Sequence, residues 1–98
     1  MKNYIGKKVL VRGIQSGVYF GELVSQDEQE VEMWNVRNLW RWSGANTLLD
    51  LAENGAKNIS ECRFSNKVKS IVLTDVCEIV PCSDNAVKNI ESVAEWTY

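Results

Sequence analysis

The chain has 98 residues, a length that fits one globular domain with a core of its own. Its 45% hydrophobic and 24% charged residues are ordinary for such a domain and exclude a disordered or fibrous chain. The net charge is −2, from 11 basic and 13 acidic residues, so the chain lacks the positive excess with which nonspecific nucleic-acid binders displace counterions. We expect a single domain over residues 1–98.

The sequence favours a cytoplasmic protein without a membrane partner. It contains no run of 18 apolar residues, and no signal-peptide stretch follows its first residues. The three cysteines, Cys62, Cys77 and Cys82, are an odd number in a chain that needs no disulfide. We expect them to remain thiols.

Three strands are predicted in the first half of the chain. Residues 8–12 and 18–24 are rich in β-branched and aromatic side chains, and a Ser16-Gly17 turn separates them. Gly21, inside the second strand, indicates a bulge or a tight bend. After a polar loop at 25–29, a third strand is predicted from 30 to about 42. This is long for a strand, so we expect a bulge near 35–38.

Two short helices are predicted in the second half. The first begins near Thr47, whose hydroxyl is suited to cap it, and ends at Gly55. The second covers about 85–94, with Ser83 or Asp84 as its cap.

Between the helices, residues 68–80 are apolar on both faces, which is typical of a central strand or of one covered by a helix. The predicted order is therefore β-β-β-α-β-α. This order indicates an α+β fold: a strongly bent antiparallel sheet, or a small SH3-like barrel, with the two helices packed on it.

The sequence contains no histidine, which removes the usual acid–base residue of catalysis, the histidine-based triads and most zinc chemistry. The cysteine spacing matches no zinc-binding pattern, and no glycine-rich phosphate loop occurs. We therefore expect a protein that is not an enzyme, with no catalytic residues, no metal and no cofactor.

The segment Trp34–Trp42 holds three of the four tryptophans, together with two arginines and two asparagines. Indole faces stack on planar groups, guanidinium groups bind phosphate or carboxylate, and asparagine amides recognise polar edges. The alternative is that Trp40 and Trp42 fill a small core beneath the arginines. A bulge in the strand would change faces partway and place an arginine beside a tryptophan. The candidate ligand-binding residues here are Asn35, Arg37, Asn38, Trp40, Arg41 and Trp42.

A second candidate is the segment from Arg12 to Tyr19. A loop flanked by Gly13 and Gly17 can bring backbone N–H groups close to an anion, with Arg12 beside it. The alternative, which the segment taken alone favours, is a plain hairpin turn. Arg12 and Tyr19 complete the set of candidate ligand-binding residues.

Four blocks of the sequence stand out: Tyr4–Arg12, Ser16–Gly21, Asn35–Ala45 and Glu78–Cys82. Together they resemble a family of short, uncharacterised proteins encoded by tailed bacteriophages and prophages. In that family the third block usually reads Asn-Ala-Arg-Arg followed by an aliphatic residue, so Val36 and Asn38 depart from it. The resemblance implies no activity. It implies a small protein made in the cytosol of an infected bacterium.

Three functions are compatible with these observations. The first is a non-enzymatic anti-defence protein that sequesters a small anionic, nucleotide-like signal, with a homo-oligomer able to place the pocket between subunits. The second is an inhibitor that presses its Trp/Arg surface on a host or defence enzyme. The third, binding of single-stranded nucleic acid, is the weakest because the net charge is negative.

Overall fold

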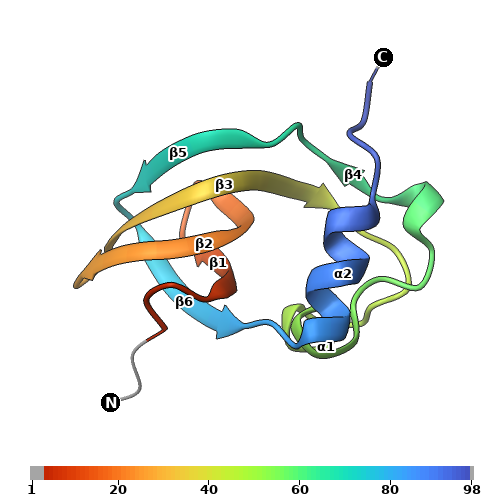
Figure 1. Cartoon of the computed structure of the whole chain (residues 1–98), viewed down its shortest axis with the longest axis horizontal. Helices are drawn as coiled ribbons and strands as arrows, with labels where there is room; N and C mark the ends of the chain where they lie inside the picture. The colour runs from red at the N-terminus through yellow and green to blue at the C-terminus, as the bar shows by residue number, and fades with distance from the viewer. Residues whose placement is uncertain (1–3, 98) are drawn as a thin grey trace.

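The computed structural model describes residues 4–97, which form a bent antiparallel sheet and two helices (Figure 1). The strands are β1 (Lys8–Gly13), β2 (Gly17–Asp27), β3 (Glu30–Arg41), β4 (Arg63–Phe64), β5 (Val68–Leu73) and β6 (Val76–Pro81). The two α-helices are α1 (Leu48–Asn54) and α2 (Asp84–Ser92), and a short 3-10 helix, η1 (Ile59–Glu61), lies between them in the chain. The strand order is β4-β3-β2-β1-β6, and β5 also pairs with β3. The α+β fold with a strongly bent antiparallel sheet is confirmed.

The predicted strand at 68–80 is two strands, β5 and β6, separated by Thr74 and Asp75. β5 pairs with β3 and β6 pairs with β1, so the sheet stays open between them and neither strand is central. The apolar residues on both faces have a different cause. Ile79 packs toward one core of the molecule, and its neighbour Val80 packs toward the other.

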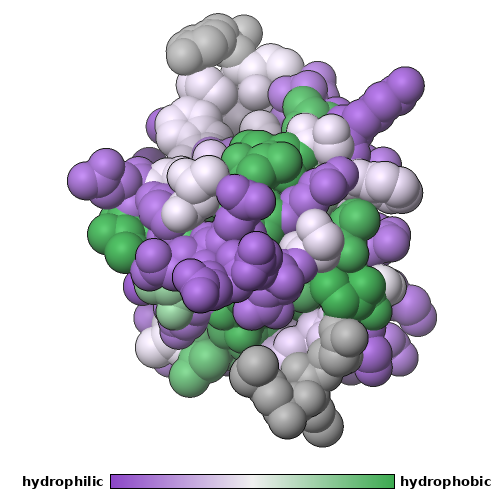
Figure 2. Space-filling view, turned by 90° about the vertical axis from the view of Figure 1, so that its left-hand side faces the viewer, coloured by the Kyte–Doolittle hydropathy of each residue, from purple (hydrophilic) through white to green (hydrophobic). Residues whose placement is uncertain are grey.

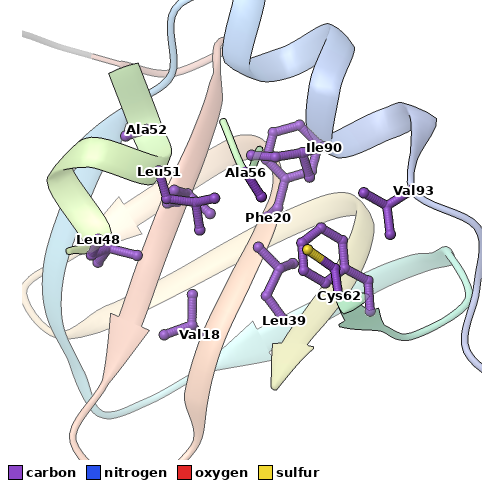
Figure 3. Packing of buried hydrophobic residues seen from close by; sticks show 12 residues of the cluster. Val18, Phe20, Leu39, Leu48, Leu51, Ala52, Ala56, Cys62, Ile90 and Val93 are labelled. Atoms are coloured by element: carbon purple, nitrogen blue, oxygen red, sulfur yellow. The ribbon is translucent and has the colours of Figure 1, made fainter. Parts of the chain in front are cut away.

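The two cores lie on opposite faces of the sheet, because side chains alternate along a strand. The sheet core consists of Val9, Val11, Leu23, Val31, Met33, Val36, Leu73 and Val76. The helix core consists of Leu10, Val18, Phe20, Leu39, Leu48, Leu51, Ala52, Ala56, Cys62, Phe64, Ile90 and Val93. Figure 3 shows how α1 and α2 bring their apolar side chains onto strand residues of the helix core.

The predicted bulge lies in β3, at Asn35. Phe20 pairs with Arg37 and Glu22 pairs with Trp34, so two steps along β2 correspond to three steps along β3. Asn35 has a φ of 54°, a left-handed conformation that asparagine tolerates better than most residues. Gly21 lies opposite, where the backbone of β3 comes close.

Local signals in the sequence set the ends of the helices. The Thr47 hydroxyl accepts a hydrogen bond from the N–H of Asp50, and the Ser83 hydroxyl accepts one from the N–H of Ala86. Gly55 ends α1 with a φ of 76°. These caps are confirmed. The loop predicted at 25–29 is shorter than expected, because β2 and β3 remain paired as far as Asp27 and Glu30.

We predict that replacing Gly21 with alanine destabilises the fold. A Cβ at this position would lie 3.0 Å from the Trp34 carbonyl oxygen and 3.2 Å from the Val36 Cα, both of which are backbone atoms of the bulge. The expected loss is about 1–3 kcal/mol of unfolding free energy, typical of overpacking. Urea denaturation measures it. The control is Ser25→Ala on the exposed part of the same strand, with an expected change within about 0.5 kcal/mol. Equal stability of the two variants would contradict the prediction.

Candidate functional site

Arg37 is a structural residue rather than an accessible ligand-binding one. Its side chain is only 5% exposed. The guanidinium donates hydrogen bonds to the carbonyl oxygens of Ser65 and Ile90, each at 2.9 Å, and it lies 5.4 Å from the centre of the Phe64 ring. Burial lowers its pKa, and the opposing effect of nearby Glu95 is smaller. Arg37 therefore ties β3 to the C-terminal end of α2, where a cation suits the helix dipole.

Three further candidates take part in packing. The Asn38 amide donates to the Val18 carbonyl oxygen at 3.2 Å, and the Asn38 backbone N–H donates to the Ser65 hydroxyl at 2.8 Å. Trp42 is half-buried against the helix core, as the alternative interpretation of the segment expected. Tyr19 is half-buried against the sheet core.

The loop between β1 and β2 does bind an anion, but the anion belongs to the chain itself. The carboxylate of Asp75 accepts three hydrogen bonds: from the backbone N–H of Gln15 at 2.7 Å, from the backbone N–H of Ser16 at 3.0 Å and from the hydroxyl of Ser16 at 2.8 Å. Gly13 leaves room for it, because a Cβ there would lie 2.5 Å from the carboxylate. These hydrogen bonds lower the pKa of Asp75. Arg12 is likewise paired, with Glu78 at 3.4 Å.

Asn35 lies at an open hollow with a volume of about 380 Å³, which Trp34, Asn35, Lys69 and Ser70 line. The Trp34 indole N–H donates to Glu32 at 2.9 Å. This hollow lies where β3 pairs with β5, and Trp40 lies farther along β3, where β3 pairs with β4. The structure therefore divides the Trp/Arg segment between two places.

Aromatic and cationic side chains cluster around Trp40, which is 51% exposed. The edge of one indole faces the other in the pair Trp40 and Trp96, with ring centres 5.2 Å apart. The Arg63 guanidinium lies 4.9 Å from the Trp96 ring centre and 5.9 Å from the Trp40 ring centre. The arginine beside Trp40 is therefore Arg63 of β4, and not an arginine of the Trp34–Trp42 segment as the sequence led us to expect. We call Trp40, Arg41, Arg63 and Trp96 the Trp40 surface.

Arg41 joins this surface through the pairing of β3 with β4. Leu39 pairs with Phe64 and Arg41 pairs with Arg63, so two residues of β3, Trp40 and Arg41, lie against one residue of β4. Two arginines thus occupy directly paired positions. Neither makes an ion pair with any residue between 4 and 97. Sequence reasoning missed Arg63 and Trp96, which are distant in the chain and belong to no motif.

Few other groups of the described residues are candidates for metal binding or thiol chemistry. Within the described part of the chain, no three cysteine or acidic side chains group as metal ligands would. Cys62 is buried, Cys77 is exposed, and burial raises the pKa of the Cys82 thiol to about 12. None of the helices in residues 4–97 has the length and apolar character to cross a membrane.

The comparisons with known proteins bear on family and not on activity. A family model described as "Domain of unknown function (DUF6948)" matches residues 6–90. No curated protein and no solved structure matches the chain.

We predict that Arg37→Ala lowers the unfolding free energy by about 2–4 kcal/mol, because it leaves two carbonyl oxygens without their donor and opens a void beside Phe64. Arg41→Ala, an exposed position on the same strand, is the control and should change it by less than about 0.5 kcal/mol. Thermal and urea denaturation measure both. If Arg37→Ala is as stable as Arg41→Ala, Arg37 does not hold the fold together.

We also predict that Asp75→Asn removes part of the stability of the protein in a pH-dependent way. The folded-state pKa of Asp75 is lowered, so its contribution is fully present above the pKa of the unfolded chain, about 4. It is lost as the pH falls through the lower, folded-state pKa. The difference in unfolding free energy between wild type and Asp75→Asn should therefore be largest near neutral pH and shrink below about pH 4. A difference that does not vary with pH would refute this role.

Proposed function

Because this chain belongs to the DUF6948 family, whose function is unknown, we propose a function from its surface: it is a non-enzymatic binding protein whose Trp40 surface recognises an acidic segment of a partner protein. The observation that carries the proposal is the half-exposed Trp40, held by Trp96 and Arg63. Removing the exposed half of a tryptophan from water is favourable by about 3 kcal/mol, before the entropic cost of association is subtracted. Tryptophan and arginine dominate the strongest contacts of protein interfaces.

The paired arginines indicate the chemistry of the partner. Like charges directly opposite each other across two strands destabilise the pair. Arg41 and Arg63 occupy such positions, and no carboxylate of residues 4–97 forms an ion pair with either. An anionic group placed between them would relieve the repulsion, since guanidinium groups bind carboxylate and phosphate with two parallel hydrogen bonds. The partner should therefore carry an anion next to an apolar or planar group.

Exposure favours a protein partner over a small molecule. A site that sequesters a small ligand encloses most of the surface of that ligand. Trp40 and Arg41 are both exposed, so a single copy offers a platform at this point. In the phage setting that the sequence resemblance implies, such a partner would be a host or defence enzyme.

A small anionic, nucleotide-like ligand is the second candidate, and the pairing of Arg41 with Arg63 favours it specifically. Indole and guanidinium together are the groups that hold a base and its phosphate. This version requires a second subunit to close the pocket over Trp40. Single-stranded nucleic acid is the weakest candidate, because the net charge is −2.

We predict that Trp40→Ala and Arg63→Ala each weaken partner binding at least tenfold, because each removes a central contact. The tagged chain is first used to capture proteins from bacterial lysate. The affinity of each captured protein is then measured for the wild type and the two variants. The control is Trp34→Ala, a tryptophan of similar exposure on the same strand, which should bind as the wild type does.

A thermal-shift panel of cyclic and linear nucleotides separates the two candidates, since a ligand that binds the folded state must raise the melting temperature. Stabilisation that Arg63→Ala abolishes would favour the nucleotide. If no protein and no nucleotide binds in a manner that depends on Trp40 or Arg63, the Trp40 surface is not a binding site.

A further inference from the structure

The hollow at Trp34 lies at the bulge of β3, away from the Trp40 surface. Its volume is about 380 Å³, and Trp34, Asn35, Lys69 and Ser70 line it. The hollow is open, so it is suited to receive part of a longer molecule rather than to enclose a small one. It shares no residue with the Trp40 surface, so an inference about it stands independently of the proposed function.

The indole of Trp34 is exposed and held in one orientation. It is 46% exposed, and its N–H donates a hydrogen bond to a carboxylate oxygen of Glu32 at 2.9 Å. Because the indole N–H is already used, the part that remains for a ligand is the face of the ring. The face of an aromatic ring carries partial negative charge, so it packs well against C–H groups.

Three groups that donate hydrogen bonds line the same hollow. They are the amide of Asn35, the ammonium group of Lys69 and the hydroxyl of Ser70. The side chains of Asn35 and Ser70 make no hydrogen bond with residues 4–97, and Lys69 forms no ion pair there. All three donors are therefore available to a ligand that rests on the indole.

Two carboxylates border the indole as well. Glu22 pairs directly with Trp34 across β2 and β3, and Glu32 accepts the hydrogen bond of the indole N–H. Side chains of directly paired residues lie on the same face of a sheet, with Cβ atoms about 4.5–5.5 Å apart. Neither glutamate forms an ion pair with the described residues. The ring is thus bordered by acceptors with negative charge and by donors, one of which is positive.

We propose that this hollow binds a neutral saccharide, one ring of which stacks on Trp34. A sugar hydroxyl both donates and accepts hydrogen bonds, so it suits a carboxylate as well as an amide or an ammonium group. A small anion is disfavoured because Glu22 and Glu32 repel it, and a small cation is disfavoured because Lys69 repels it. In β-linked sugars of the glucose type the ring hydroxyls are equatorial. The axial C–H bonds therefore cover both faces of the ring and match the face of an indole.

The surroundings of the hollow suit more than one sugar ring. Val72 is 55% exposed and lies two residues from Ser70 on the same face of β5, so a second ring has an apolar side chain to cover. Toward the hairpin of β2 and β3 the surface becomes polar. Figure 2 looks at the end of the molecule where this hairpin lies, and hydrophilic side chains gather at its centre. Polar groups with isolated apolar ones between them match a saccharide, whose rings present C–H faces and hydroxyl edges.

Saturation-transfer NMR tests the proposal with two probes at millimolar concentration, cellobiose and chitobiose. We expect saturation to reach at least one of them, and to be stronger at the protons on one face of a ring, because that face stacks on the indole. Trp34→Ala should weaken binding at least tenfold. The matched control is Trp40→Ala, because Trp40 is 51% exposed on the same strand, and this variant should bind the sugar as the wild type does.

A second variant, Asn35→Gly, does not depend on how Trp34→Ala folds. Asn35 has a φ of 54°, which glycine adopts readily, so the fold is kept while the amide is removed. We expect binding of the sugar to be about three- to tenfold weaker, which corresponds to the loss of a hydrogen bond. The melting temperature should be little changed.

The remaining outcomes overturn the proposal. If neither sugar binds the wild type, the hollow is not a saccharide site. Binding that survives Trp34→Ala, or that Trp40→Ala removes, places the sugar elsewhere. AMP and tetramethylammonium serve as an anionic and a cationic probe, and if either binds in a manner that depends on Trp34 while the sugars do not, the class of ligand is wrong.

Discussion

The third strand supplies side chains to two cores on opposite faces of the sheet. The extra residue at Asn35 shifts the alternation of side chains, and this shift decides which residues after it enter which core. Val31 and Met33 enter the sheet core before the bulge, and Val36 enters it after an added step. Leu39 then reaches the helix core. In a regular strand Val36 would point away from Met33. The close approach of the bulge to β2 is also why position 21 is a glycine.

The bulge decides which polar side chains remain available for binding. It directs Arg37 beneath the end of α2, where two carbonyl oxygens occupy its guanidinium. It also separates the exposed Trp34, which lies beside β5, from the exposed Trp40, which lies beside β4. Residues that are close in the sequence and alike in type therefore have different roles. A cluster of arginine and tryptophan in the sequence does not show which of its members face the solvent.

Features that depend on local chemistry were predictable from the sequence. The caps at Thr47 and Ser83, the end of α1 at Gly55 and the bulge in β3 each follow from residues within a few positions of the feature. The turn at Thr74 and Asp75 was not, because it contains neither glycine nor proline. It is held by contacts across the chain, in which Asp75 binds the loop between β1 and β2. Arg63 and Trp96 were not among the predicted site residues for the same reason, because only the folded chain brings them to Trp40.

The four arginines show how the chain distributes its strongest cationic groups. Arg12 is paired with Glu78, and Arg37 is buried against carbonyl oxygens, so the fold itself accounts for both. Even the N–H groups of the loop between β1 and β2 are satisfied internally, by the carboxylate of Asp75. Arg41 and Arg63 differ: they are placed opposite each other, beside an exposed indole, without an ion pair to residues 4–97. The fold accounts for its other anion-binding groups from within the described residues, and it is this remaining pair to which the proposed function assigns an anion from outside the chain.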